Sequence, residues 1–376
     1  RSAIFLPFSN LGLIVVDEEH DASYKQQDPA PRYQARDAAS MLGRLHGAAV
    51  VLGSATPSLE ARFAVGAGRA AHIELAERFG GTSLPEVGLI DLRKAHKQRA
   101  MEGHFSRTLL EALKSTLDAG KQAILFQNRR GFAPVYQCRT CGWVPDCERC
   151  DVSLTYHKYL KDLHCHYCGY RQGEPQTCPR CGSEEVEAKG LGTERIEEEV
   201  TQLLPGVKVQ RMDLDTTRSR TGHERIIRAF EQGEIQVLVG TQMVTKGLDF
   251  ERVGLVGILQ ADHMLHFPDF RALERTFQLL TQVAGRAGRR GERGQVLIQT
   301  FDPEHWVFQH VVTHDAQAMA EAELKERESF GYPPVVRLVR LVLKHRDPHL
   351  NREAAAALAG RLRSRLTVAD GTPAPL

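Results

Sequence analysis

Short continuous runs of apolar residues recur along the chain and are separated by longer segments of mixed polarity. An apolar run of this length without polar alternation is typical of a parallel β-strand that is buried on both faces. We therefore predict strands over residues 11–16, 48–52, 122–127, 207–212, 235–239, 253–259 and 294–300.

The segments between these strands carry apolar residues at the three- and four-residue spacing of amphipathic helices. They predict helices over residues 36–45, 106–119, 193–204, 223–232 and 269–286. Strands that alternate with helices are typical of α/β folds with parallel sheets. Only a cysteine-rich block interrupts the alternation, so we expect two parallel-sheet lobes, the first incomplete, with an inserted module.

The pattern changes after residue 300. A predicted helix over 315–330 leads to Gly-Tyr-Pro-Pro, a predicted strand over 335–344 and an Ala-rich helix over 351–366, which indicate the start of a small α+β domain. A stretch rich in Gly, Pro and polar residues over 78–86 is interpreted as a linker. The predicted boundaries are 1–78 for the C-terminal part of the first lobe, 79–135 and 187–314 for the second lobe, 136–186 for the insertion and 315–376 for the C-terminal domain.

Composition indicates which class of protein this chain belongs to. A chain of 376 residues is long enough for two to three domains, and 42% hydrophobic with 26% charged residues is ordinary for a globular protein. No apolar run reaches membrane-spanning length, so we expect a cytoplasmic protein with no membrane partner. The net charge of +2 does not by itself indicate a nucleic-acid ligand.

All 8 cysteines lie in C-x-x-C pairs within residues 138–181. In a reducing compartment such pairs are metal ligands rather than disulfides, and four thiolates suit tetrahedral zinc. A nested pairing joins the two inner pairs across a 14-residue spacer, close to the zinc-ribbon template, whereas sequential pairing requires a tighter turn. We favour the nested sites, which are Cys138/Cys141/Cys178/Cys181 and Cys147/Cys150/Cys165/Cys168.

Four thiolates leave no open coordination position, so both zinc sites are expected to be structural, and a nuclease or zinc hydrolase is excluded. The insertion is interpreted either as a staple alone or also as a surface that contacts DNA or a partner. The candidate contacts on that surface are Trp143, Tyr156, Tyr167 and Arg171.

An acidic motif, Asp17-Glu18-Glu19-His20, follows the first predicted strand directly. The carboxyl end of a parallel strand faces the ligand crevice, so Asp17 is expected to hold Mg²⁺ and Glu18 to activate the attacking water. The turn after the second strand carries Ser54 and Thr56, whose hydroxyls suit a hinge that senses the γ-phosphate.

The segment Gln282 to Arg289 reads Gln-Val-Ala-Gly-Arg-Ala-Gly-Arg. Its arginines, Arg286 and Arg289, are three residues apart, which predicts one helical face. An arginine fork suits the charge on a transferring phosphoryl group, so we expect the second lobe to complete a site whose carboxylates lie on the first.

Together these segments resemble the superfamily 2 DNA helicases, and among them the primosomal helicases of bacteria that reload replication at stalled forks. The resemblance covers nearly the whole chain and includes four C-x-x-C pairs between Asn-Arg-Arg-Gly-Phe and Gly-Leu-Gly-Thr-Glu. It implies two RecA-like lobes, ATP with Mg²⁺ as the fuel, and two zinc ions in nested sites.

The resemblance also implies roles for individual residues. Asp17 and Glu18 match the Walker B acids, and Arg289 matches the arginine finger. The coupling residues that it implies are His20, Lys246, Asp249 and Gln282. An aromatic-rich loop that would bind DNA contains Tyr24, Lys25, Arg32 and Tyr33, although residues 28–31 lack the tryptophan that the family pattern leads us to expect.

The implied activity is 3′-to-5′ unwinding, recognition and remodelling of stalled forks, and promotion of primosome assembly. The implied partners are forked and single-stranded DNA, single-stranded-DNA-binding protein and other primosome proteins, in the nucleoid of a bacterial cytoplasm.

No G-x-x-x-x-G-K-[ST] loop occurs in the sequence, and the chain begins at Arg1. We expect the loop and an N-terminal DNA-binding domain to lie upstream in a longer parent, and the 376 residues alone not to hydrolyse ATP. The alternative is a non-catalytic, zinc-stabilised DNA- or protein-binding module derived from a helicase.

Overall fold

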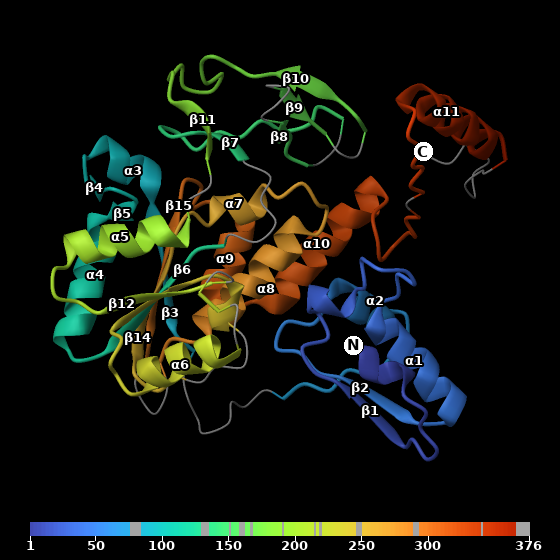
Figure 1. The fold of residues 1–376 in the computed structure, drawn as a ribbon, viewed down its shortest axis with the longest axis horizontal. Helices are drawn as coiled ribbons and strands as arrows, with labels where there is room; N and C mark the ends of the chain where they lie inside the picture. The colour runs from blue at the N-terminus through green and yellow to red at the C-terminus, as the bar shows by residue number, and fades with distance from the viewer. Residues whose placement is uncertain are drawn as a thin grey trace.

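The computed structural model describes residues 1–75, 84–128, 135–149, 152–157, 162–165, 168–189, 192–213, 216–217, 220–245, 250–288, 293–339 and 341–365. It has the predicted α/β architecture, with a large parallel sheet, a smaller parallel sheet and a cysteine-rich module (Figure 1).

The second lobe is built on a six-stranded parallel sheet with the order β12-β13-β6-β14-β15-β3. Its strands are β3 (Glu86–Asp91), β6 (Gln122–Phe126), β12 (Val209–Met212), β13 (Val237–Gly240), β14 (Val253–Ile258) and β15 (Gln295–Thr300). The predicted strands of this lobe are confirmed to within about two residues at their ends.

Helices cover both faces of this sheet. The helices of the lobe are α3 (Leu92–Lys97), α4 (Arg107–Asp118), α5 (Thr193–Leu203), α6 (Arg220–Glu231), α7 (Asp262–Leu265), α8 (Ala272–Ala284) and α9 (Trp306–Thr313). On β6, Ile124 and Phe126 pack into a core with α6, α8 and α9, whereas Ala123 and Leu125 pack into a second core with α4 and α5. Burial on both faces explains why the four positions from Ala123 to Phe126 are all apolar.

The edge strand β3 was not predicted. It pairs in parallel with β15 from Glu86 opposite Gln295 to Asp91 opposite Thr300. Its short apolar centre lies between polar ends and directly after the predicted linker, so local pattern does not separate it from a loop. A small hairpin of β4 (Met101–Glu102) and β5 (Phe105–Ser106) precedes α4.

The first lobe contributes two parallel strands, β1 (Leu13–Val16) and β2 (Ala49–Leu52), and the helices α1 (Ala35–His46) and α2 (Leu59–Gly66). The prediction that these strands are buried on both faces is wrong within this structure. Leu13 and Val15 are 56% and 62% exposed, because among the described residues α1 covers the other face of this two-stranded sheet.

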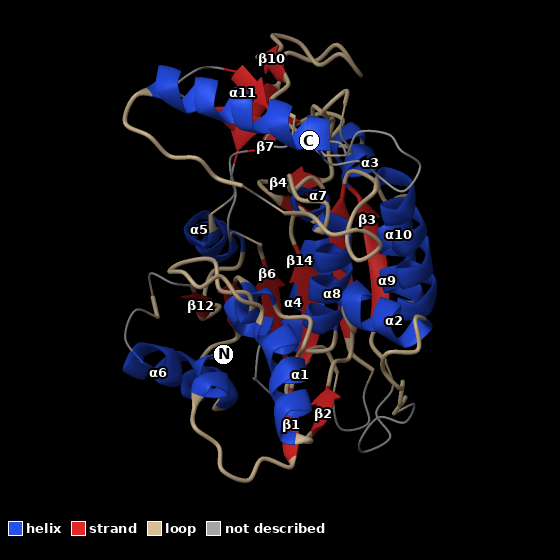
Figure 2. Cartoon of the chain, turned by 90° about the vertical axis from the view of Figure 1, so that its right-hand side faces the viewer, coloured by secondary structure: helices blue, strands red, loops and turns tan. Residues whose placement is uncertain are grey.

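The cysteine-rich module lies at one end of the molecule, and β1 and β2 lie at the opposite end (Figures 1 and 2). Its strands are β7 (Val135–Cys138) paired with β11 (Val186–Lys189), and the sheet of β8 (Thr155–His157), β9 (Asp162–His164) and β10 (Arg171–Gly173). Its chain enters through β7 after the second-lobe strand β6 and leaves through β11 before α5, as expected of an insertion.

Two helices follow the second lobe, α10 (Ala316–Phe330) and α11 (Pro348–Arg365). Met319 of α10 packs into the core of the second lobe, whereas α11 has no buried residues. The strand predicted over 335–344 is wrong for the residues described there, since no other described strand lies beside them to share hydrogen bonds.

Candidate nucleotide cleft and zinc sites

The two polar loops of the first lobe lie side by side because parallel strands deliver their carboxyl ends to one edge. The backbone N–H of Gly53 donates to the carbonyl of Val16 at 2.9 Å, and that of Glu19 donates to the carbonyl of Gly53 at 3.0 Å. These bonds hold the acidic motif against the turn after β2. Both motifs therefore lie at the same edge of the first-lobe sheet, and a ligand crevice at this edge stays a prediction.

Glu18 adopts a left-handed backbone conformation, with φ of 47°. This region is costly for a residue with a side chain and is found preferentially at functional sites. The backbone N–H of Glu18 donates to Oδ1 of Asp17 at 2.9 Å, which stabilises the turn. The Glu18 side chain remains 45% exposed, so its carboxylate is accessible to a ligand.

The predicted coupling residues of the first lobe gather around this turn. Nδ1 of His20 lies 2.7 Å from Oγ of Ser54 and 3.5 Å from Oε2 of Glu18. Oγ of Ser54 also accepts from the backbone N–H of Thr56 at 3.0 Å. His20 therefore connects the acidic motif to the turn after β2 through side chains.

Glu19 plays a part that sequence reasoning missed. Its side chain is almost wholly buried, with Oε2 accepting from Arg36 at 2.8 Å and from the Ser58 hydroxyl at 2.9 Å. Oε1 accepts from the backbone N–H of Ser58 at 2.6 Å. A buried carboxylate needs such donors, and here they join the acidic motif to the start of α2. The partners lie 17 and 39 residues away, so no local pattern reports them.

The candidate DNA-binding loop is closed by its own polar side chains. Nζ of Lys25 donates to the carbonyl of Arg32 at 3.0 Å, and Nε of Arg32 donates to the carbonyl of Gln27 at 2.7 Å. The ring of Tyr33 contacts the ring of Phe5 edge-on, with 4.8 Å between the two ring centroids. These contacts order the loop around its aromatic residues.

Tyr24 connects this loop to the acidic motif. Its hydroxyl donates to the backbone carbonyl of Asp17 at 2.7 Å. Burial and the nearby carboxylates, led by Asp17, raise the pKa of Tyr24, so the phenol stays protonated as a donor.

Helix α8 brings the second lobe to the acidic motif. The amide of Gln282 donates to Oε1 of Glu18 at 3.5 Å. The predicted helix over 269–286 extends too far, because α8 ends at Ala284 and Arg286 lies in the following turn. Because only Arg286 of the two arginines is described, the helical face that it is expected to share with the second arginine stays a prediction. Arg289, Lys246 and Asp249 lie outside the described residues.

The cysteines form the predicted nested groups. Cys138, Cys141, Cys178 and Cys181 place their sulfur atoms within 4.8 Å of one another, and Cys147, Cys165 and Cys168 do the same. Cys150, the fourth predicted ligand of the inner site, lies outside the described residues. Four sulfur atoms about 2.3 Å from a tetrahedral zinc ion lie about 3.8 Å from one another. The Sγ–Sγ distances of 3.5, 3.6 and 3.7 Å within the two groups fit this geometry. The nested pairing is thus confirmed for the described cysteines.

Three of the cysteine pairs end in glycine at Gly142, Gly169 and Gly182, each with φ of 74° to 77°. In each pair the glycine N–H donates back to the carbonyl of the first cysteine, which closes a tight knuckle. At Gly142 a Cβ would also collide with the Phe301 side chain of the second lobe. Glycine therefore serves both the knuckle and the docking of the module.

Two histidines of the second lobe hold the module in place. Nε2 of His263 lies 2.9 Å from Oε1 of Gln137, and Nδ1 of His266 lies 3.2 Å from Oγ of Ser153. Burial lowers the pKa of His263 to about 4, so this imidazole is neutral at ordinary pH.

The candidate contacts on the module surface differ in exposure. Arg171 is exposed, whereas Trp143 and Tyr156 are half-buried. Tyr167 lies outside the described residues. A role of the module surface in recognising DNA or a partner therefore stays a prediction.

Comparisons with known proteins agree with this arrangement. The model of the PriA DNA helicase Cys-rich region matches residues 147–172, and the model of the helicase conserved C-terminal domain matches residues 188–291. Within the described residues, no helix combines the length and apolar character needed to cross a membrane.

Individual relatives align along nearly the whole chain. The replication restart protein PriA of Bacillus subtilis is 47% identical over 347 residues, and that of Synechocystis is 45% identical over 350 residues. These alignments cover 92% and 91% of this chain but 43% and 42% of the relatives, so the chain spans less than half of their length. A structure of RecG bound to a three-way DNA junction covers 95% of this chain and 35% of that chain at 14% identity, with a TM-score of 0.45, which is too weak to add to the sheet order.

The parallel sheet, the two cysteine groups and these alignments lead to one conclusion: the chain belongs to the PriA family of replication restart helicases.

Proposed function

We propose that the chain carries motor elements of an ATP-dependent DNA helicase that unwinds in the 3′-to-5′ direction, remodels stalled replication forks and promotes primosome assembly. The observation that carries the proposal is the contact between Gln282 of α8 and Glu18 of the acidic motif. It joins the two lobes at the crevice edge of the first-lobe strands, where a nucleotide would bind.

The chemistry follows from the residues around that contact. Mg²⁺ supplies charge neutralisation to the phosphates, and Asp17 is the carboxylate that would hold it. The exposed carboxylate of Glu18 accepts the proton of the attacking water. Arg286 and Arg289 stabilise the charge on the transferred phosphoryl group from the side of the second lobe.

Movement of DNA depends on coupling between lobes. Ser54, Thr56 and His20 would sense the γ-phosphate, since the His20–Ser54 bond connects both loops. Lys246, Asp249 and Gln282 would respond on the second lobe. Tyr24 offers a direct route from the DNA-binding loop, because its hydroxyl holds the backbone of Asp17.

The zinc module has a structural role in this proposal. Two closed tetrathiolate sites stabilise an insertion with a small core, and the bonds of Gln137 and Ser153 seat it on the second lobe. The partners are forked and single-stranded DNA, single-stranded-DNA-binding protein and other primosome proteins. The setting is the nucleoid of the bacterial cytoplasm.

The test uses the full-length gene product on forks whose single-stranded tail is either 3′ or 5′. ATP-dependent unwinding that requires the 3′ polarity and is lost in Glu18→Gln supports the proposal. Binding of forks without ATP turnover would favour the non-catalytic module instead. Residues 1–376 alone are proposed not to turn over ATP, since the sequence has no G-x-x-x-x-G-K-[ST].

A further inference from the structure

One face of α8 contacts the first lobe along its whole length. The residues on this face are Arg271, at the start of the helix, followed by Glu274, Gln278 and Gln282 at helical spacing. Their partners in the first lobe are Glu60, the N–H of Leu59, the carbonyl of Thr56 and Glu18. Only Gln282 belongs to the arginine-containing motif, so the contact face extends about three turns beyond it.

Glu274 lies at the centre of this face and is only 4% exposed. Its Oε1 accepts from the backbone N–H of Leu59, the first residue of α2, at 3.0 Å. A carboxylate is stabilised at a helix N-terminus, where backbone N–H groups lack partners in the helix. Ser58, which caps the same helix, is bound by Glu19. Glu274 therefore holds the segment to which the acidic motif is fastened.

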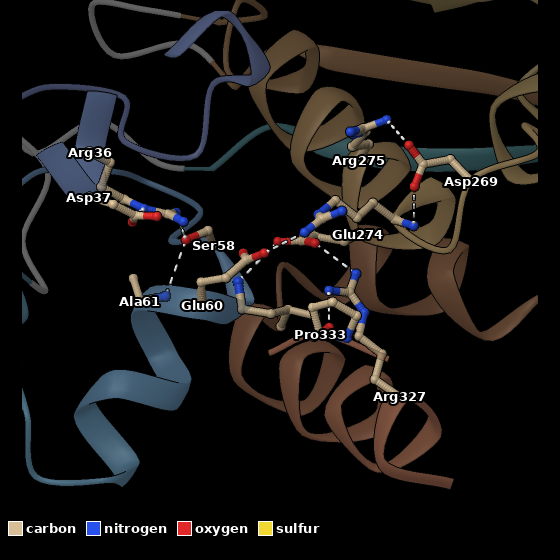
Figure 3. Close-up of polar contacts among 12 residues, drawn as sticks. Arg36, Asp37, Ser58, Glu60, Ala61, Asp269, Glu274, Arg275, Arg327 and Pro333 are labelled. Atoms are coloured by element: carbon tan, nitrogen blue, oxygen red, sulfur yellow. Dashed lines mark hydrogen bonds and ion pairs between the residues drawn. The ribbon is translucent and has the colours of Figure 1, made fainter. Parts of the chain in front are cut away.

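The second oxygen of Glu274 is held from the opposite direction. Oε2 accepts from Arg327 of α10 at 2.7 Å, and Arg327 is only 2% exposed. Arg327 also donates to Glu323 at 3.0 Å and to the carbonyl of Pro333 at 3.1 Å. Figure 3 shows Glu274 between the start of α2 and this guanidinium. A buried pair of this kind fixes geometry, because each charge depends on the other for compensation.

Helix α10 itself contacts both lobes. Met319 lies in the core of the second lobe, and Gln317 accepts from Arg62 of α2 at 2.6 Å. The continuous path therefore runs from α10 through Arg327 and Glu274 to Leu59, and on through Ser58 to Glu19 of the acidic motif.

We propose that Glu274 is a positioning residue for the acidic motif, and that through it Arg327 of α10 sets the arrangement of the two lobes in which ATP is hydrolysed. The inference rests on the proposed ATPase function and deepens it. Glu274 touches neither nucleotide nor DNA in this scheme. Its loss therefore lowers the rate of the chemical step and leaves ligand affinity unchanged.

The decisive variant is Glu274→Gln in the full-length gene product. The amide is isosteric and can still accept from Leu59, while Arg327 keeps Glu323 as its charge partner, so folding is retained. We expect kcat for DNA-dependent ATP hydrolysis to fall at least about tenfold, because small displacements of reacting groups lower the rate of a reaction by this much or more. The KM for ATP and the Kd for forked DNA should stay within about twofold of the wild-type values, because the residues that contact ATP and DNA are unchanged. Arg327→Lys should lower kcat in the same way, because one ammonium cannot reproduce the planar fork.

Arg275→Gln is the matched control, since Arg275 lies on the same helix in an exposed pair with Asp269 and should behave as wild type. A wild-type kcat in Glu274→Gln overturns the inference. So does a loss of folding or an equal loss of DNA affinity, which would mark a purely structural residue. Failure of the proposed function is distinguishable, because then the wild type itself shows no turnover that Glu18→Gln removes.

Discussion

The amide nitrogen of Gln282 lies 3.5 Å from Oε1 of Glu18, although the two residues are 264 positions apart in the chain. The contact places α8 of the second lobe directly against the candidate catalytic carboxylate of the first. The left-handed backbone conformation of Glu18 sets the direction in which its carboxylate leaves the turn. This contact is one of several along α8 at which the two lobes meet.

Gln282→Ala should reduce kcat for ATP hydrolysis by about tenfold while nucleotide affinity changes little. The physical reason is that losing a hydrogen bond to a charged group costs about 1.5–3 kcal/mol. The lower end applies to this contact because its N–O distance is long, at 3.5 Å, and about 1.4 kcal/mol is a factor of ten in rate. Steady-state ATPase assays with DNA, together with equilibrium nucleotide binding, measure both quantities. Gln309→Ala on α9 is the control, because the described contacts of the Gln309 side chain are limited to a nearby loop carbonyl.

Arg289→Ala should abolish ATP turnover while nucleotide binding is retained. Normal turnover in this variant would show that Arg289 is not the arginine finger.

Tyr24→Phe should weaken the stimulation of ATPase activity by DNA while leaving the DNA-independent rate near that of the wild type. The substitution deletes only the hydroxyl that donates to the carbonyl of Asp17 and keeps the ring for stacking. The measurement is the ratio of ATPase rates with and without single-stranded DNA. An unchanged ratio would show that this hydrogen bond carries no signal between DNA and the acidic motif.

Cys147→Ser should release the inner zinc ion and leave the outer one bound, because the cysteines form two separate groups. Zinc per chain should fall from about two to about one, since each closed site holds one ion. Metal analysis after dialysis against a chelator measures this stoichiometry, and we expect the insertion to unfold while motor ATPase partly survives. Thr140→Ala is the control within the module. Full zinc retention in Cys147→Ser would refute the ligand assignment.

Glu323→Gln should change how stability depends on pH. Burial raises the pKa of Glu323 from 4.5 to about 7, with Arg327 opposing this rise and Glu274 adding to it. A carboxyl whose folded pKa is raised contributes stability below its unfolded pKa, and this contribution is lost as the pH rises through the folded pKa. The wild type should therefore lose stability relative to Glu323→Gln between about pH 4.5 and 7, by on the order of 3 kcal/mol.

Urea midpoints measured from pH 5 to 8 test this difference. Glu328→Gln, an exposed position on the same helix, should follow the wild type at every pH. Parallel curves for the wild type and Glu323→Gln would mean that Glu323 does not bind a proton more tightly in the folded protein.

The sequence predicted most strands of the second lobe well, and it predicted the edge strand and the ends of helix α8 less well. Strands such as β13 and β14 are apolar throughout because both faces are buried, and this pattern is local. The edge strand β3 was missed because its pairing with β15, more than 200 residues away, is what makes it a strand. The helix predicted over 269–286 began three residues before α8 and ended two residues after it, because residue pattern alone does not mark where a helix begins and ends.

By itself, the sequence determined the α/β class, the grouping of the cysteines and the position of the acidic motif at a strand end. Each of these depends on residues close together in the chain, through strand periodicity, knuckle spacing or a strand-to-turn junction. Only the tertiary structure decided that Glu19 is a buried anchor and that Glu274 joins Leu59 to Arg327. Those contacts span 215 and 53 residues, and a polar side chain gives no local sign of which distant partner will compensate its burial.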